Sequence, residues 1–376
     1  MTWKVGGALA LLLVLVGVAG SAAVGPMAER AHPEREHPER EHPERETWRR
    51  AYRVPAEIPF PEDNPYSLVK AELGRRLFFD PILSGDRSRA CVSCHLPDLA
   101  WADGRARALS RGASGMELRT PTLLNLAWQE RLGWDGKFRD LESVAFLPIT
   151  AAGNMNLPVA EALRRLSADP EYARAFADAF PDPAVTRDRV EDALATFERL
   201  IVSGPAPFDR WIAGDAGAID AAARRGFDLF NGKAHCAACH SGWSFTDGSF
   251  HDIGTAAGED IGRGRFFPNS PALRYAFKTP GLRAVAVRAP YMHDGSVATL
   301  EAVIDLYDRG GIDRPSRSAD IRPLGLSRDE KSDLVAFLRS LTPESTAVPA
   351  TGALTSVPPR PPAPTGHAGP AVTSQH

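Results

Sequence analysis

Hydrophobic residues recur at helical spacing in several parts of the chain. One set comprises Leu194, Phe197, Leu200 and Ile201. A second set comprises Val303, Leu306 and Tyr307. Two glycines, Gly310 and Gly311, follow the second set and are typical of a helix end, because glycine adopts the left-handed conformation there at little cost. Both segments are therefore predicted to be amphipathic helices.

A third helix is predicted to begin after Ser327. Ser327 and Glu330 have the spacing of a capping box, and a hydrophobic face follows at Leu334, Leu338 and Leu341. No segment shows the sustained alternation of a β-strand or the rhythm of βαβ units. The expected fold class is therefore mainly α, with long irregular loops rich in Gly and Pro.

The N-terminus has the order of a secretory signal. Lys4 precedes an apolar run from Val5 to Gly20, and the small residues Ser21, Ala22 and Ala23 follow. We therefore predict a signal peptide over residues 1–23 and a periplasmic location. An uncleaved membrane anchor stays open, because ~20 apolar residues can span a bilayer.

Polar segments of low complexity flank the rest of the chain. The five-residue repeat His-Pro-Glu-Arg-Glu occurs three times from His32 to Glu46, so residues 24–60 are predicted to be a disordered linker. Metal capture by the repeat histidines His32, His37 and His42 is the alternative. Residues 342–376 are predicted to be a disordered Pro-rich tail. The formal net charge of -3 gives no field that favours nucleic acid.

All four cysteines lie in two Cys-x-x-Cys-His motifs: Cys91, Cys94 and His95, and Cys236, Cys239 and His240. This motif is typical of covalent haem c, in which both thiols join the haem vinyl groups and the histidine binds the iron. A thioredoxin-like pair would need neither the histidine nor a second copy, and disulfides would not require the histidine. A zinc site would bring its two cysteine pairs closer together in sequence. The sequence therefore predicts two covalently bound haems.

Similar residues surround the two motifs. Arg75 to Phe78 precedes the first motif as Arg224 to Phe227 precedes the second, and Trp101 to Gly104 follows the first as Phe245 to Gly248 follows the second. Each half is therefore predicted to be one haem module. We place the N-terminal domain at residues 61–204 and the C-terminal domain at residues 205–341.

Five segments together resemble the bacterial di-haem cytochrome c peroxidase and MauG family. They are Leu73 to Asp80, Pro121 to Asn125, Trp134 to Gly136, Pro290 to Gly295, and Thr299 to Glu301. The resemblance extends over residues 65–341. It implies a two-domain, mostly helical fold with one cytochrome c-like haem in each domain. It also implies that the N-terminal haem reacts with peroxide and that the C-terminal haem transfers electrons.

The resemblance assigns roles to two aromatic residues. Trp134 matches the tryptophan that lies between the haems in the family; its alternative role is that of a core aromatic. Tyr307 matches the sixth ligand of the C-terminal haem, where peroxidases have Met and MauG-like members have Tyr. Tyrosinate is a hard anionic donor that favours oxidised iron, so Tyr307 points to the MauG-like branch. A half-buried tyrosine without ligand function is the alternative, and Met292 is expected to pack nearby.

The chain departs from the family pattern around the N-terminal haem. The loop from Leu109 to Arg119 contains no histidine that could act as a dissociable distal ligand. Asn154 stands six residues after Pro148, where the family has an acid/base glutamate. Asparagine cannot transfer a proton, and a positioned acid/base contributes ~10²–10⁴-fold in rate. Glu117 could act in its place, although an exposed loop glutamate is the simpler expectation.

The resemblance also implies a calcium ion between the haems. Pro290 matches this site, but Arg119 and Arg288 stand where the family has neutral oxygen donors. Calcium needs oxygen ligands, and two guanidinium groups would repel it. Calcium stays open as a cofactor but is not favoured.

Taken together, these features predict a MauG-like di-haem oxidoreductase. Hydrogen peroxide would oxidise an external donor, which is either a small periplasmic cytochrome c or copper protein, or a side chain of a partner protein. The alternative, motivated by Asn154, is a di-haem electron-transfer cytochrome that has lost peroxidase activity.

Overall fold

A computed structural model describes residues 43–111 and 116–344. The predicted signal peptide, most of the His-Pro-Glu-Arg-Glu repeats with their three histidines, and nearly all of the predicted C-terminal tail lie outside the described residues. Among the described residues, no helix is both long and apolar enough to cross a membrane.

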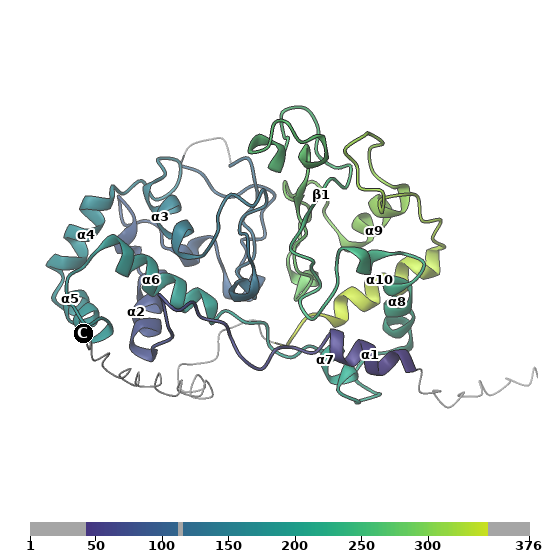
Figure 1. Ribbon diagram of the computed structural model, residues 1–376, viewed down its shortest axis with the longest axis horizontal. Coiled ribbons are helices and arrows are strands. Elements are labelled where there is room, and N and C mark those ends of the chain that lie inside the picture. The colour runs from purple at the N-terminus through teal and green to yellow at the C-terminus, as the bar shows by residue number, and fades with distance from the viewer. Residues whose placement is uncertain (1–42, 112–115, 345–376) are drawn as a thin grey trace, which may run out of the picture. The chain divides into compact units, whose positions relative to one another are not determined.

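The described fold consists mainly of helices joined by long loops (Figure 1). The helices are α1 (Pro43–Ala51), α2 (Leu68–Phe79), α3 (Glu142–Thr150), α4 (Val159–Ala168), α5 (Pro170–Ala179), α6 (Arg187–Arg199), α7 (Pro207–Ile212), α8 (Ala221–Asn231), α9 (Leu300–Arg309) and α10 (Arg328–Ser340). The strands β1 (Phe250–His251) and β2 (Phe277–Lys278) pair antiparallel, with Phe250 opposite Lys278. Short 3₁₀ turns include η2 (Cys91–Ser93), η4 (Leu126–Trp128), η5 (Cys236–Ala238) and η8 (Val285–Val287).

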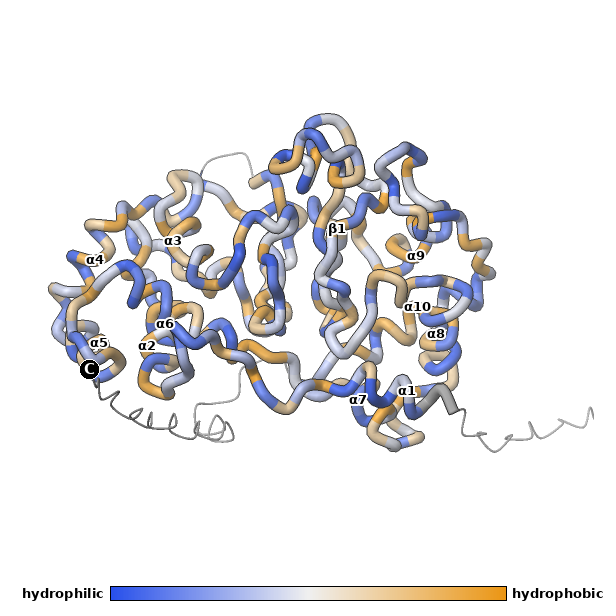
Figure 2. Tube along the Cα trace, in the orientation of Figure 1, coloured by the Kyte–Doolittle hydropathy of each residue, from blue (hydrophilic) through white to orange (hydrophobic). Residues whose placement is uncertain are grey.

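The three helices predicted from hydrophobic spacing are confirmed as α6, α9 and α10. Ser327 caps α10 and forms the predicted capping box with Glu330. Gly310 ends α9 in the left-handed conformation. Hydrophobic and hydrophilic residues both occur along the helices, as expected of amphipathic helices with one buried face (Figure 2).

Two separate hydrophobic clusters divide the helices into two halves. In the N-terminal half (α2 to α6), α2 packs against α6, and residues such as Leu77, Phe78 and Phe197 are buried. In the C-terminal half (α7 to α10), α8 packs against α10 around Phe227 and Phe337, and these two helices lie side by side in Figure 1.

Glycine allows the same close helix contact in both halves. A side chain at Gly74 of α2 would overlap the carbonyl group of Ala193 in α6, and one at Gly226 of α8 would overlap that of Asp333 in α10. The phenylalanine four residues after the carbonyl group, Phe197 in α6 or Phe337 in α10, also contacts the glycine. The two halves therefore contain the same pair of crossing helices.

The predicted disorder of residues 24–60 is wrong for the part that the structure describes. Residues 43–51 form α1, and Tyr52 is only 4 % exposed within the C-terminal cluster. Tyr52 stacks on Phe245 and donates a hydrogen bond from its hydroxyl group to Asn231 Oδ1. The aromatic residues Trp48 and Tyr52 bury enough apolar surface to order a segment that begins as a polar repeat.

Candidate active site

The two Cys-x-x-Cys-His motifs have the same backbone geometry. The first cysteine of each pair begins a 3₁₀ turn, η2 or η5, and the second cysteine follows the turn. The backbone N–H of the histidine donates to the carbonyl oxygen of the first cysteine, at 3.1 Å for His95 and 2.9 Å for His240. Burial raises the pKa of Cys91 and of Cys236 to about 12. The turn therefore presents two protonated thiols and one imidazole from five consecutive residues.

Both motif histidines are oriented by a backbone carbonyl group. Nδ1 of His95 lies 3.0 Å from the carbonyl oxygen of Trp101, and Nδ1 of His240 lies 2.9 Å from that of Phe245. A carbonyl oxygen only accepts, so Nδ1 must donate and Nε2 keeps its lone pair. Burial lowers the pKa of both histidines, which favours the neutral imidazole that a metal ion binds.

Trp101 and Phe245 adopt the same backbone conformation, which turns their carbonyl groups toward the histidines. Both residues have positive φ, 60° and 55°, and both are almost fully buried. Positive φ is uncommon for a bulky residue and persists only where packing enforces it. The aromatic residue six or five positions after the histidine is therefore part of each site, a role that the sequence analysis did not assign.

A largely apolar cavity lies against the second motif. Cys236, Cys239 and His240 line it on one side, and Tyr307 of α9 lines it as well. The apolar lining includes Leu282, Val285, Leu300, Val303, Ile304, Leu334 and Leu338. The cavity thus combines the thiols and imidazole of the motif with a phenol and an apolar wall.

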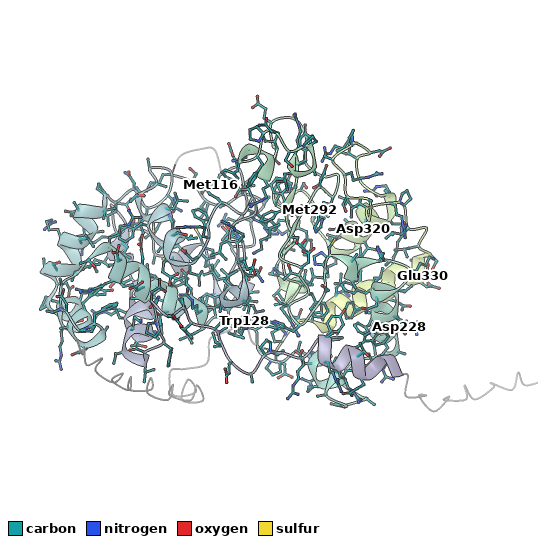
Figure 3. All side chains as sticks on the ribbon, viewed as in Figure 1. Met116, Trp128, Asp228, Met292, Asp320 and Glu330 are labelled. Atoms are coloured by element: carbon teal, nitrogen blue, oxygen red, sulfur yellow. The ribbon has the colours of Figure 1, made fainter. Side chains whose placement is uncertain are left out.

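Several cavity residues outside the motif carry a donor atom: His235, His251 and His293 line the cavity, as do Tyr307 and Met292, to which the sequence points. Tyr307 is half-buried, and burial raises the pKa of its phenol group. Met292, labelled in Figure 3 in the loop before α9, lines the same cavity and has φ of 70°. The expectation that Met292 only packs therefore stays a prediction, as does the ligand role of Tyr307.

Trp134 lies where the two halves meet. Its indole Nε1–H donates to the carbonyl oxygen of Arg119 at 3.1 Å, and its ring lines the cavity of the second motif. It is half-buried. A tryptophan at the junction is compatible with both the transfer role and the alternative role in the core.

Two backbone hydrogen bonds cross the junction in a reciprocal manner. The N–H of Lys278 donates to the carbonyl oxygen of Trp134 at 2.8 Å, and the N–H of Arg119 donates to that of His293 at 3.0 Å. Lys278 and Arg119 each precede Thr-Pro, and Trp134 and His293 each precede Asp-Gly. Equivalent segments of the two halves therefore contact each other, and His293 is the counterpart of Trp134. The two repeated pairs Thr-Pro and Asp-Gly were the signal that could have revealed this contact.

Asn154 lies in the turn after α3. Its backbone carbonyl oxygen accepts a hydrogen bond from Arg111 Nε at 2.5 Å, and Arg111 is paired with Asp86 at 2.6 Å. Asn154 itself is half-buried, and its amide is not ionisable. The structure does not bring Glu117 into a buried site: its side chain is 84 % exposed and faces Arg265 at 3.9 Å.

Comparison with known proteins is decisive for the family. The family profile described as di-haem cytochrome c peroxidase matches residues 69–217, and the cytochrome c profile matches residues 223–342. The methylamine utilization protein MauG of Methylorubrum extorquens is 51 % identical over 299 residues, which cover 79 % of this chain and 85 % of that protein. The chain belongs to the di-haem cytochrome c peroxidase and MauG family.

Other members of the family show the same relation. MauG of Methylophilus methylotrophus is 47 % identical, with 78 % of this chain and 88 % of the relative covered. The cytochrome c551 peroxidase of Nitrosomonas europaea is 31 % identical, with 76 % and 83 % covered. A crystal structure described as a MauG-like protein associated with microbial copper homeostasis aligns with a TM-score of 0.72 and 33 % identity, over 78 % of this chain and 95 % of that chain.

As a member of this family, the protein is an oxidoreductase with two cytochrome c-type domains and two covalently bound haem c groups. The structure fits this cofactor. Each half presents two thiols and a neutral imidazole on one turn, and the second motif opens on an apolar cavity. Family membership also implies a peroxide-linked reaction and a protein or cytochrome partner.

The residues at the junction do not fit a calcium ion. The carbonyl oxygen of Arg288 accepts a hydrogen bond from Arg119 Nη2 at 2.8 Å, and both guanidinium groups are buried. A hard cation requires free oxygen ligands, whereas this carbonyl is already bound to a positive group. Pro290, the remaining match to the family's calcium site, cannot compensate for two buried cations.

Proposed function

We propose that the protein is a MauG-like di-haem oxidase, which couples hydrogen peroxide to the oxidation of an external donor. Haem would be attached at Cys91 and Cys94 with His95 as proximal ligand, and at Cys236 and Cys239 with His240 as proximal ligand. The haems supply the redox chemistry with peroxide and store the oxidising equivalents. Export to the periplasm accords with this proposal, because c-type haem is attached outside the cytoplasm.

The observation that carries the proposal is the position of Tyr307. It lines the cavity of the second motif together with Cys236, Cys239 and His240. A phenol at this position supplies a hard oxygen donor, which stabilises oxidised iron, where a thioether would stabilise reduced iron. Two MauG proteins are 51 % and 47 % identical to this chain, which supports the same branch.

The remaining site residues hold and orient the reacting groups. Trp101 and Phe245 keep the proximal imidazoles in one tautomer and orientation. Trp134 would pass electrons between the halves; its ring lines the C-terminal cavity and its Nε1–H donates to the N-terminal half, which supports this role. Asn154 would hydrogen-bond to a polar ligand in the N-terminal half without transferring a proton.

The donor is proposed to be either a side chain of a partner protein or a small periplasmic cytochrome c or copper protein. The test is peroxide-dependent oxidation by the pure holoprotein, in both its fully oxidised and half-reduced forms. Reduced cytochrome c, reduced copper protein and a tyrosine- and tryptophan-containing protein would be offered separately. Turnover above that of free haem with any donor is expected, and no such turnover would refute the proposal.

A second function is favoured by Asn154 alone. A di-haem electron carrier needs no acid/base beside the N-terminal haem. Residue 154 is an asparagine, whose amide cannot act as one. The carrier function predicts that neither ferric haem binds cyanide or peroxide and that both give low-spin spectra. A high-spin component that disappears on cyanide addition would contradict the carrier and support the oxidase.

A further inference from the structure

Two arginines from different halves are buried together at the junction. Arg119 is 5 % exposed and Arg288 is 8 % exposed. Arg119 Nη2 donates to the carbonyl oxygen of Arg288 at 2.8 Å, and Arg288 Nη2 donates to that of Gly281 at 2.5 Å. These contacts fix the position of both cations, but all the acceptors are neutral. We call Arg119 and Arg288 the arginine pair.

In the part of the chain that the structure describes, the arginine pair lacks a directly bonded carboxylate. Neither guanidinium forms an ion pair there, and the Nε–H of each is buried without an acceptor. Asp103 influences the pKa of Arg119, but its carboxylate already accepts from Thr120 Oγ1 at 2.7 Å and from the N–H of Arg105 at 3.0 Å. Two buried cations without a partner are strongly unfavourable.

Other buried arginines of the chain have the partner that this pair lacks. Arg199 is bonded to both carboxylate oxygens of Glu142, at 2.6 and 2.9 Å, and Arg283 lies 2.7 Å from Asp209. Burial and the charge of Arg119 lower the pKa of Arg288 to about 10, so it remains charged at neutral pH. The arginine pair is therefore suited to an anion that is not part of the polypeptide.

The location of the pair indicates which anion. Arg119 and Arg288 both line the cavity that Cys236, Cys239 and His240 also line. A haem held by these residues would carry two propionate carboxylates, the kind of anion that a guanidinium binds. Guanidinium groups bind carboxylates through paired N–H groups, and the unsatisfied Nε–H groups are donors of this kind.

We propose that the arginine pair holds the propionates of the C-terminal haem and takes the place of a divalent cation between the two halves. The proposal rests on haem attachment at Cys236 and Cys239 as proposed above. Because Arg119 comes from the N-terminal half and Arg288 from the C-terminal half, propionate binding also ties the halves together. The guanidinium of Arg119 donates to the carbonyl oxygen of Arg288, which a metal ion at this position would need as a ligand. The protein therefore requires no calcium.

The first experiment compares Arg119→Leu and Arg288→Leu holoproteins with Arg119→Lys and Arg288→Lys, which keep the charge. Arg265→Leu is the control, because Arg265 also lies at the junction but already faces Glu117 and Asp135 at 3.9 Å. The readouts are the midpoint potentials of both haems and the resonance Raman bands of propionate bending. Loss of a nearby cation destabilises reduced haem relative to oxidised haem.

We therefore expect both Leu variants to lower the potential of the C-terminal haem and to shift its propionate bands. The Lys variants should restore most of the potential, and Arg265→Leu should change neither readout. Unchanged potential and bands in both Leu variants would overturn the proposal. If a Leu variant does not fold, the Lys variants still decide, because loss of the paired N–H groups must shift the propionate bands.

Haem content separates this proposal from the one on which it rests. Each variant is assayed for covalent haem under denaturing conditions, with two haems per chain expected throughout. One haem or none in the wild-type protein would refute the attachment proposal itself, whereas two haems with unchanged propionate bands would refute only the role of the arginine pair.

The second experiment concerns calcium. The wild-type holoprotein is treated with a calcium chelator and then titrated with calcium, while haem spectra and heat of binding are recorded. We expect unchanged spectra and no saturable binding. Saturable binding of one calcium ion, with a spectral change that the chelator reverses, would overturn the replacement of the metal ion by arginine.

Discussion

Single residues distinguish two motifs that are otherwise alike. His95 and His240 have the same carbonyl partner geometry, and Trp101 and Phe245 have the same backbone conformation. The differences lie away from the motifs, at Asn154 in the N-terminal half and Tyr307 in the C-terminal half. Function is therefore expected to respond to substitutions at these two positions more specifically than to changes elsewhere.

Replacing Tyr307 by phenylalanine tests the oxygen ligand. Tyr307→Phe removes the phenol oxygen and leaves the apolar contacts of the ring, so the low-spin signal of the C-terminal haem should be lost from the electron paramagnetic resonance spectrum of the oxidised protein. Met292→Leu is the matched control from the same cavity and should leave this signal unchanged. Loss of the signal in Met292→Leu instead would show that the thioether is the ligand.

Asn154→Glu tests the missing acid/base. A carboxylate at this position should accelerate the reaction of the ferric protein with peroxide, by at most about 10²–10⁴-fold, the usual contribution of a positioned acid/base. The rate is measured by stopped-flow absorbance. Asn154→Gln has the length of glutamate without its proton and should not accelerate the reaction. Equal rates in wild type and Asn154→Glu would mean that proton transfer is not limiting there.

At the level of secondary structure, each half depends on one pair of crossing helices. Gly74 lets α2 approach α6, and Gly226 lets α8 approach α10. Each helix pair also lies beside a haem motif, because α2 contacts η2 and α8 contacts η5. The helices thereby determine the position of both Cys-x-x-Cys-His turns.

Gly226→Ala is expected to destabilise the C-terminal half. Its methyl group would overlap the carbonyl group of Asp333 and come within 2.8 Å of Phe337 Cβ, so α8 and α10 must separate. Such overpacking costs about 1–3 kcal/mol, which corresponds to a fall in Tm of roughly 2–4 °C per kcal/mol. Tm is followed by circular dichroism. Gly217→Ala, with only a 3.5 Å contact to Asp215, should melt like wild type; an equal fall in both variants would contradict the explanation.

At the level of the whole molecule, the junction joins equivalent segments of the two halves. The reciprocal bonds from Lys278 to Trp134 and from Arg119 to His293 pair the segments before Thr-Pro with those before Asp-Gly. The same positions carry different side chains, an indole in one half and an imidazole in the other. The His293 ring stacks on the Phe277 ring, with centroids 3.7 Å apart, and bonds to Asp260, whereas the Trp134 indole donates to the carbonyl oxygen of Arg119.

Trp134→Phe should slow electron exchange between the haems without changing the absorption spectrum of either. Phenylalanine is harder to oxidise and cannot donate to the Arg119 carbonyl group. The measurement is the delay between the spectral changes of the two haems after rapid mixing with peroxide. Trp128→Phe is the control, since Trp128 packs on Trp243 across the same junction with ring centroids 4.8 Å apart. A longer delay in Trp128→Phe alone would assign the transfer to that pair.

Much of the protein follows from local sequence. Haem attachment is a property of five consecutive residues, so Cys91 to His95 and Cys236 to His240 were recognisable without a structure. Helices α6, α9 and α10 were recognisable because hydrophobic spacing and capping act within a few turns. Family membership followed from several such local segments occurring in one order.

Tertiary structure decided what depends on contacts between distant segments. The sequence alone did not place Tyr52 in the C-terminal cluster, and it treated Arg119 and Arg288 as obstacles to calcium rather than as one buried pair. These residues are separated by up to 169 positions, and their meeting depends on the packing of whole halves. Burial is what makes an anionic partner necessary for the two arginines. Water would screen their charges at the surface, but inside the molecule a charge requires a partner.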